Sequence, residues 1–177
     1  MRGDVLYSMN RAPEAEKEYL AAVSLHPSEF TWSSLADYYR KQDREPETIE
    51  ALKTAIQLQA RPEVSLVQLG YYYLHLKRPN DALEAFEEAV RSAPRELTSA
   101  TGRGSFSYNV ASGRAVAWNA LGDAGQAISF QEDAAQLAPD SPQPWLNLAK
   151  LYQLQGRVAD AERANARAAT LLQNQGH

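Results

Sequence analysis

The stretch LVQLGYYYLHLKRPNDALEAFEEAVRSAP, residues 66–94, contains two runs of small and apolar residues at helical spacing. The first run consists of Leu66, Leu69, Gly70 and Tyr73, and the second of Ala82, Ala85, Phe86 and Ala89. Residues that recur three and four positions apart lie along one face of an α-helix. The stretch is therefore predicted to form two amphipathic helices.

The residue sizes in this stretch predict how the two helices pack. Gly70 and Ala82 are small enough to let the helix backbones approach each other, and Phe86 supplies bulk that would lie between one helix pair and the next. Pro94 is predicted to follow the end of the second helix, because proline has no amide hydrogen and disfavours helical geometry in the preceding residue. Neither helix can bury its apolar face alone, so pairs of this kind must stack.

The same pattern recurs along the whole chain at intervals of 33, 34, 45 and 34 residues. Small residues occupy the first such position at Gly3, Ala36, Gly70, Ala115 and Ala149. A large apolar residue follows three positions later, at Leu6, Tyr39, Tyr73, Trp118 and Tyr152. The second helix carries Ala15, Thr48, Ala82, Ala127 and Ala161, then Ala22, Ala55, Ala89, Ala134 and Ala168. Several sets in register indicate an internal repeat of about 34 residues.

A 34-residue unit with a small residue, an aromatic residue three positions later and a proline near its end resembles the tetratricopeptide repeat family. The resemblance implies an all-α fold, a right-handed α-solenoid of antiparallel helix pairs with about five units, the first incomplete. We predict one domain over residues 1–177. Its units are expected at about 1–28, 29–62, 63–96, 108–141 and 142–176, with an insertion loop at 97–107.

The first unit lacks the start of its first helix, since Gly3 already occupies the small-residue position. Two explanations are open. The chain could continue a longer protein with further repeats, or the apolar N-terminal edge could be an interface, for example for self-association.

The insertion at residues 97–107, LTSATGRGSFS, has no helical periodicity and is predicted to be an extended loop. Long connections often contact ligands, so Arg103 and Phe106 are possible partner contacts. The alternative is that the repeat sequence has drifted here and that the loop is merely tolerated on the surface. The helix after the loop is atypical, because Arg114 stands where the second, third and fifth units have leucine. Its guanidinium must reach solvent or find a buried acceptor.

Composition narrows the function. Lysine and arginine number 18 against 22 acidic residues, for a net charge of -4, which argues against nucleic acid as a partner. The sequence has no cysteine and no apolar run long enough to cross a bilayer. We expect a soluble protein whose compartment is open, with the cytoplasm slightly favoured over the periplasm.

Partners of the resembled family bind a concave groove built from the first helices of the units. Counting from the aromatic position, the groove residues would include Val64 and Val116 together with Phe30, Asp37, Arg40, Val67, Tyr71, His75, Asn109, Ser112, Asn119, Lys150 and Gln153. Asparagine and glutamine can satisfy both donors and acceptors of a peptide backbone. An ordinary solvated helix face is the alternative for each residue alone.

No catalytic, metal or cofactor site is predicted. The histidines are His26, His75 and His177, and no pair has metal-ligand spacing on a helix face. We therefore predict a protein that is not an enzyme and acts as a scaffold binding a peptide segment or helix of a protein partner. The alternative is a regulatory or substrate-recruiting part of a larger enzyme, or an envelope or secretion assembly factor.

Overall fold

A computed structural model describes residues 2–93 and 105–174 of the 177-residue chain. These residues form α-helices and turns and include no strand, which confirms the all-α class. The contacts divide the chain into two compact units, Met1–Pro62 and Glu63–His177, and the division falls at a predicted repeat boundary. The single domain over residues 1–177 stays a prediction.

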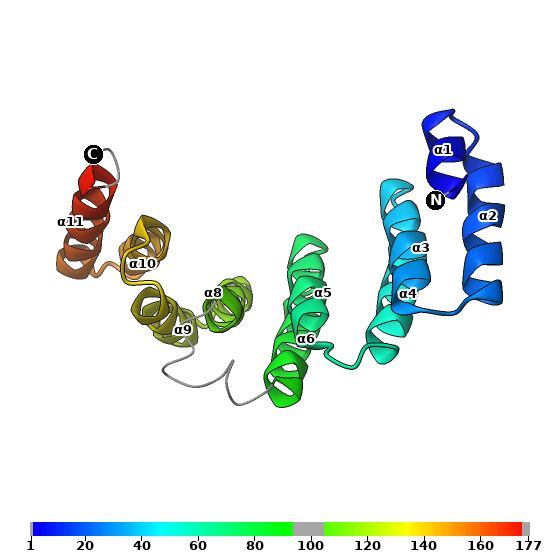
Figure 1. The fold of residues 1–177 in the computed structure, drawn as a ribbon. Helices are drawn as coiled ribbons and strands as arrows, with labels where there is room; N and C mark the ends of the chain where they lie inside the picture. The colour runs from blue at the N-terminus through cyan, green and yellow to red at the C-terminus, as the bar shows by residue number, and fades with distance from the viewer. Residues whose placement is uncertain (1, 94–104, 175–177) are drawn as a thin grey trace. The chain divides into compact units, whose positions relative to one another are not determined.

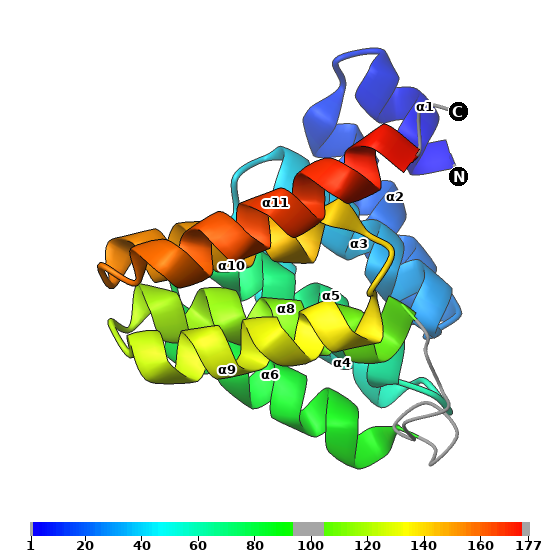
Figure 2. The ribbon, with the colours of Figure 1, turned by 90° about the vertical axis from the view of Figure 1, so that its left-hand side faces the viewer.

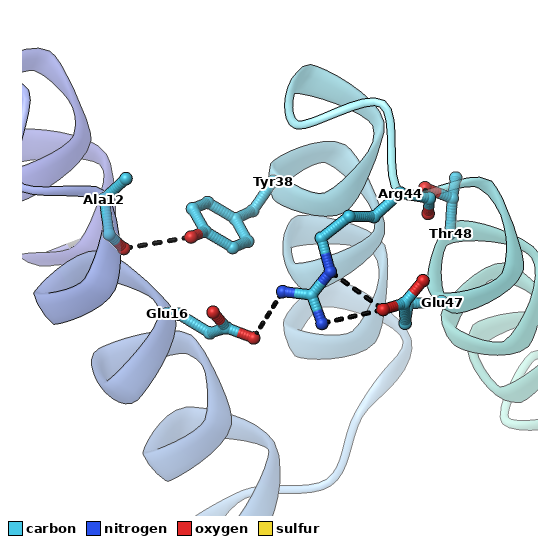
Figure 3. Close-up of polar contacts among 6 residues, drawn as sticks. All are labelled: Ala12, Glu16, Tyr38, Arg44, Glu47 and Thr48. Carbon is cyan, nitrogen blue, oxygen red and sulfur yellow. Dashed lines mark hydrogen bonds and ion pairs between the residues drawn. The ribbon is translucent and has the colours of Figure 1, made fainter.

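The first unit contains two helix pairs (Figure 1). Its helices are α1 (Arg2–Ser8), α2 (Ala12–Leu25), α3 (Glu29–Lys41) and α4 (Glu45–Gln57). Tyr38 of α3 is buried against Tyr19 of α2, with ring centroids 5.2 Å apart, and its hydroxyl donates to the Ala12 carbonyl at 2.9 Å (Figure 3). The helix α1 spans only seven residues, as the early position of Gly3 predicts.

The described residues of the second unit form three pairs. Its helices are α5 (Glu63–His75), α6 (Pro79–Ser92), α8 (Ser105–Ala120), α9 (Ala124–Leu137), α10 (Pro142–Leu154) and α11 (Val158–Asn174). The pair α8 and α9 lies beside the pair α10 and α11, with α9 packed on α10 (Figure 2). The repeated small residues are buried in every repeat. This holds for the set that includes Gly70 and for the set that includes Ala82.

Phe86 of α6 is the side chain around which α5 and α8 pack. It is fully buried. A Cβ atom at Gly70 would lie 2.7 Å from the Phe86 ring, and a Cβ at Gly113 of α8 would lie closer still. The ring therefore occupies space that only glycine leaves free on both neighbouring helices. This confirms the predicted wedge between successive repeats.

The five helix pairs formed by residues 2–93 and 105–174 each contain the same kind of turn between their two helices. One residue in each turn adopts left-handed backbone geometry, with φ between 54° and 83°, at Asn10, Asp43, Lys77, Gly122 and Gly156. The next residue donates its backbone N–H to the carbonyl of the residue five positions earlier, as Arg78 does to Tyr73 at 2.9 Å. These bonds satisfy carbonyl groups that the end of the first helix leaves free.

Arginine follows the left-handed residue in several of these turns. The guanidinium groups of Arg44, Arg78 and Arg157 lie 4.4, 4.9 and 4.4 Å from the ring centroids of Tyr39, Tyr73 and Tyr152. Each also pairs with a carboxylate three positions later, and Arg44 in addition reaches Glu16 of α2, in the preceding repeat, at 2.7 Å (Figure 3). The arginine thus ties the aromatic residue of the first helix to the start of the second.

Two expectations about the insertion need correction. The helix α8 begins at Ser105, so the last three residues of the predicted loop are helical. Phe106 is buried, with 7% of its surface exposed, so the prediction that it contacts a partner from the loop is wrong. Burial of its ring extends the helix towards the insertion. Arg103 lies outside the described residues.

Arg114 solves its packing problem in a way that the sequence did not indicate. Its guanidinium lies 5.3 Å from the centroid of the Phe130 ring on α9. Burial lowers the pKa of Arg114 below its usual value, and the Glu87 carboxylate offsets only part of this effect. The partner of this half-buried cation is thus the face of an aromatic ring.

Gly113→Ala tests the wedge. The new methyl group would meet a ring that is packed on all sides, so we expect a loss of about 1 to 2 kcal/mol after the gain in helix propensity is subtracted. Urea denaturation followed by circular dichroism measures this loss. The matched control is Gly125→Ala on α9, where a Cβ would meet only Asp123 Oδ1 at 3.5 Å. A rise in stability for both variants would contradict the wedge.

Gly156→Ala tests the turn without any steric contact. Nothing lies within 4 Å of a Cβ at Gly156, but its φ is 68°. We expect a loss of about 1 to 2 kcal/mol from the left-handed backbone alone. Gly156→Asn should lose clearly less, since asparagine tolerates this geometry. Equal melting temperatures for the two variants would show that the backbone geometry does not limit stability here.

Candidate partner-binding surface

Two first helices, α5 and α8, lie side by side in the second unit and carry most of the predicted groove residues. Tyr71 of α5 bridges them, because its hydroxyl donates to the Asn109 carbonyl of α8 at 2.8 Å. The Tyr71 ring stands edge-on to Phe86, with centroids 5.4 Å apart and an interplanar angle of 80°. The wedge beneath the two helices therefore also orients the tyrosine above it.

Exposed apolar groups lie on both helices. Val64 is 55% exposed, Val116 is 46% exposed and Tyr71 is 37% exposed. His75 and Asn119 are exposed, and Asn109 is half-buried. We call Val64, Tyr71, His75, Asn109, Val116 and Asn119 the α5–α8 surface. Its valines and ring offer area to bury, and its amides offer donors and acceptors for a polypeptide backbone.

The Tyr71 hydroxyl keeps its proton at neutral pH. Burial raises the pKa of this phenol, and a hydrogen bond with Ser112 lowers it to a smaller degree. A protonated hydroxyl is the donor that the bond to the Asn109 carbonyl requires. The bridge between α5 and α8 is therefore present at physiological pH.

Val67 and Ser112 were predicted to face the groove, and both are instead buried beneath the α5–α8 surface. Val67 is 6% exposed and Ser112 is 9% exposed. Ser112 is close enough to the Tyr71 hydroxyl to lower the pKa of that phenol. For these two residues the role that the structure supports is packing.

The remaining predicted residues lie elsewhere. Lys150 and Gln153 are exposed on α10 of the second unit. Phe30, Asp37 and Arg40 are exposed on α3 of the first unit, where Arg40 Nη2 pairs with Asp37 Oδ1 at 2.9 Å. A single groove that joins them to the α5–α8 surface stays a prediction.

The N-terminal edge carries exposed apolar side chains of its own. Val5 lies on α1, Met9 lies directly after the end of α1, and Leu20 lies on α2. Self-association through this edge stays a prediction.

Gly113 is the residue that sequence reasoning missed. It stands two positions before the repeated small residue Ala115, where the second, third and fifth units carry serine, glutamine and asparagine. A glycine inside a helix costs about 1 kcal/mol relative to alanine, so its presence signals a close packing contact. Together with Phe86 in the preceding repeat, this glycine could have predicted that the Phe86 ring packs against α8 as well as against α5.

Residues 2–93 and 105–174 contain no group of three or more histidine, aspartate or glutamate side chains placed to hold a metal ion. Over the same ranges, none of the helices combines the length and apolar character needed to cross a membrane.

Comparison with known sequences identifies the repeat. Two profiles described as tetratricopeptide repeat match the chain, one over residues 119–175 and the other over residues 64–96. Together they span about half of the chain and confirm the resemblance seen in the sequence. A search of curated proteins found no match.

Solved structures show the same fold at low identity. The crystal structure of MamA has a TM-score of 0.74 and 16% identity, and the alignment covers 98% of this chain and 96% of that one. The crystal structure of BtubC from P. vanneervenii has a TM-score of 0.75 and 17% identity, and the alignment covers 98% of this chain and 78% of that one. The crystal structure of PilW, a type IV pilus biogenesis factor, has a TM-score of 0.66 and 17% identity, and the alignment covers 97% of this chain and 74% of that one.

Tyr71→Phe tests the bridge between α5 and α8. Removing the hydroxyl should cost about 1 kcal/mol, the usual net contribution of one hydrogen bond. It should also speed amide hydrogen exchange in the first turns of α8. The matched control is Tyr72→Phe on the same helix, where exchange in α8 should not change. Unchanged exchange in the Tyr71 variant would show that the bridge does not hold the two helices together.

Proposed function

Because the chain belongs to the tetratricopeptide repeat family, we propose that it is a non-catalytic scaffold that binds a peptide segment or helix of another protein on its α5–α8 surface. Repeats of this family support a general role in protein–protein interaction and are typically non-catalytic. The observation that carries the proposal is the exposure of Val64, Tyr71 and Val116 on two adjacent first helices.

The chemistry of the α5–α8 surface favours an apolar segment as its guest. The surface includes two valines, a tyrosine ring and two asparagines, and none of its residues is lysine, arginine or a carboxylate. A guest would gain affinity by burying its own apolar side chains, and the asparagine amides would pair with its backbone. Exclusion of nucleic acid is part of the proposal and is supported by the net charge of -4.

The wider groove is also part of the proposal. Phe30, Asp37 and Arg40 on α3, with Lys150 and Gln153 on α10, would extend the contact beyond the α5–α8 surface. A recruiting part of a larger enzyme, or of an envelope or secretion assembly factor, would use the same surface. Identifying the protein that occupies the surface distinguishes these roles.

Site-specific cross-linking tests the proposal. The photoreactive residue p-benzoylphenylalanine replaces Val116 in one variant and the exposed Val158 of α11 in a control variant. Irradiation in native lysate should give a cross-linked protein at position 116 that is absent at position 158. The site of attachment, mapped by mass spectrometry, then defines a peptide of the partner for direct binding measurements.

Charge substitutions then measure the contribution of the surface. Val64→Asp combined with Val116→Asp should weaken binding of that peptide at least about tenfold, since one buried valine contributes about 1.5 kcal/mol. Both side chains are exposed, so the melting temperature should hardly change. Val158→Asp is the matched control and should bind normally. If the paired variant bound as tightly as the control, the partner would contact another part of the chain.

A further inference from the structure

We propose that the second unit holds a separate site, a pocket between α9, α10 and α11 that receives an aromatic side chain of a partner protein. The pocket has a volume of about 310 Å³. Ala135, Leu148 and Ala164 form its buried apolar floor, and Trp145, Glu132 and Arg163 also line it. None of these residues belongs to the α5–α8 surface, so the inference goes beyond the proposed function.

The repeat itself shows what fits this space. Thirty-four residues earlier, Phe130 stands where Ala164 lines the pocket, Ala111 stands where Trp145 does, and Arg114 stands where Leu148 does. The Phe130 ring is directed at α8, where the Arg114 guanidinium lies 5.3 Å from its centroid. The chain therefore places its own aromatic ring at the corresponding position of the preceding repeat. The last repeat has only a methyl group there, and the space is open.

The charges around the pocket are already paired, which favours a neutral guest. Glu132 Oε1 accepts a hydrogen bond from the Tyr152 hydroxyl at 2.6 Å. Asp160 is paired with both Arg157 and Arg163. An added cation or anion would compete with these pairs, whereas an uncharged ring would bury apolar area against the floor.

Trp145 adds a second observation. Its indole Nε1 is buried and has no hydrogen-bond partner among the described residues. The Trp145 side chain also lines the pocket, so an aromatic guest would pack against it and change the surroundings of its indole group.

The size of the pocket agrees with a single side chain. Ligand pockets commonly range from about 300 to 1,000 Å³, and this one lies at the lower limit. It is too small for most of a drug-sized molecule and large enough for a phenyl ring. We therefore assign the guest as one aromatic residue that anchors a longer partner.

Nuclear magnetic resonance of the indole groups tests this assignment in the full chain. The protein has three tryptophans, and single Trp→Phe variants assign their N–H signals. Titration with N-acetyl-phenylalanine amide should move the Trp145 signal in a saturable manner and leave those of Trp32 and Trp118 in place. N-acetyl-alanine amide should bind at least about tenfold more weakly, since it lacks the ring.

Two substitutions on α11 form a matched pair. Ala164→Phe should fill the pocket and abolish the shift, whereas Ala166→Phe, at an exposed position two residues away, should leave it unchanged. If Ala164→Phe fails to fold, Gln136→Trp at the exposed rim should block the pocket without entering the core. The Val64→Asp and Val116→Asp variant should bind the probe normally, which separates this site from the proposed function.

Several results would overturn the assignment. One is a Trp145 signal that does not respond to the probe, and another is equal shifts with the phenylalanine and alanine amides. A shift that persists in the blocked variants would place the probe elsewhere. Movement of the Trp145 signal with protein concentration alone would show that a second copy of the chain occupies the pocket.

Discussion

Packing of the Phe86 ring between Gly70 and Gly113 is the constraint on which the second unit depends. Each helix pair has an apolar face that only a neighbouring pair can cover, so the spacing of adjacent pairs decides what is buried. The ring sets that spacing for α5 and α8. It also supports Tyr71, which then reaches the Asn109 carbonyl across the two helices. A surface suited to a partner thus follows from a contact in the core.

Tertiary contacts override local preference at several places in this chain. Gly113 lies inside a helix, where alanine would be favoured by about 1 kcal/mol. Asn10, Asp43 and Lys77 adopt left-handed backbone geometry in three of the turns. Gly122 and Gly156 adopt the same geometry in two other turns, where the absence of a side chain removes the steric cost. The arginine after this residue compensates by joining an aromatic ring to a carboxylate, as Arg78 does with Tyr73 and Asp81. The turn is therefore held by side chains as well as by its backbone.

The repeat intervals were enough to predict the helices, the small residues at their contacts and the wedge, because these features recur in register. They could not predict features that belong to one repeat only. Counting along the repeat placed Val67 and Ser112 in the groove, but the close approach of α5 and α8 buries both. The loop boundary was wrong for a similar reason, since burial of Phe106 extends α8. The position of a residue within the repeat predicts which side of the helix it faces. Whether that side is buried depends on the helix that packs beside it.

One aromatic ring, shifted by one residue between repeats, connects the two candidate sites. The third repeat carries Ala85 and Phe86, the fourth carries Phe130 and Gln131, and the last carries Ala164 and Asn165. A shift of one residue turns a side chain by about 100° around the helix. At position 86 the ring fills the space beneath the α5–α8 surface, whereas at position 130 it lies against Arg114. Gln131 then takes the wedge position, fully buried, and donates to the Pro144 carbonyl at 3.3 Å. The last repeat has a ring at neither position, and this is where the pocket lined by Ala164 is found.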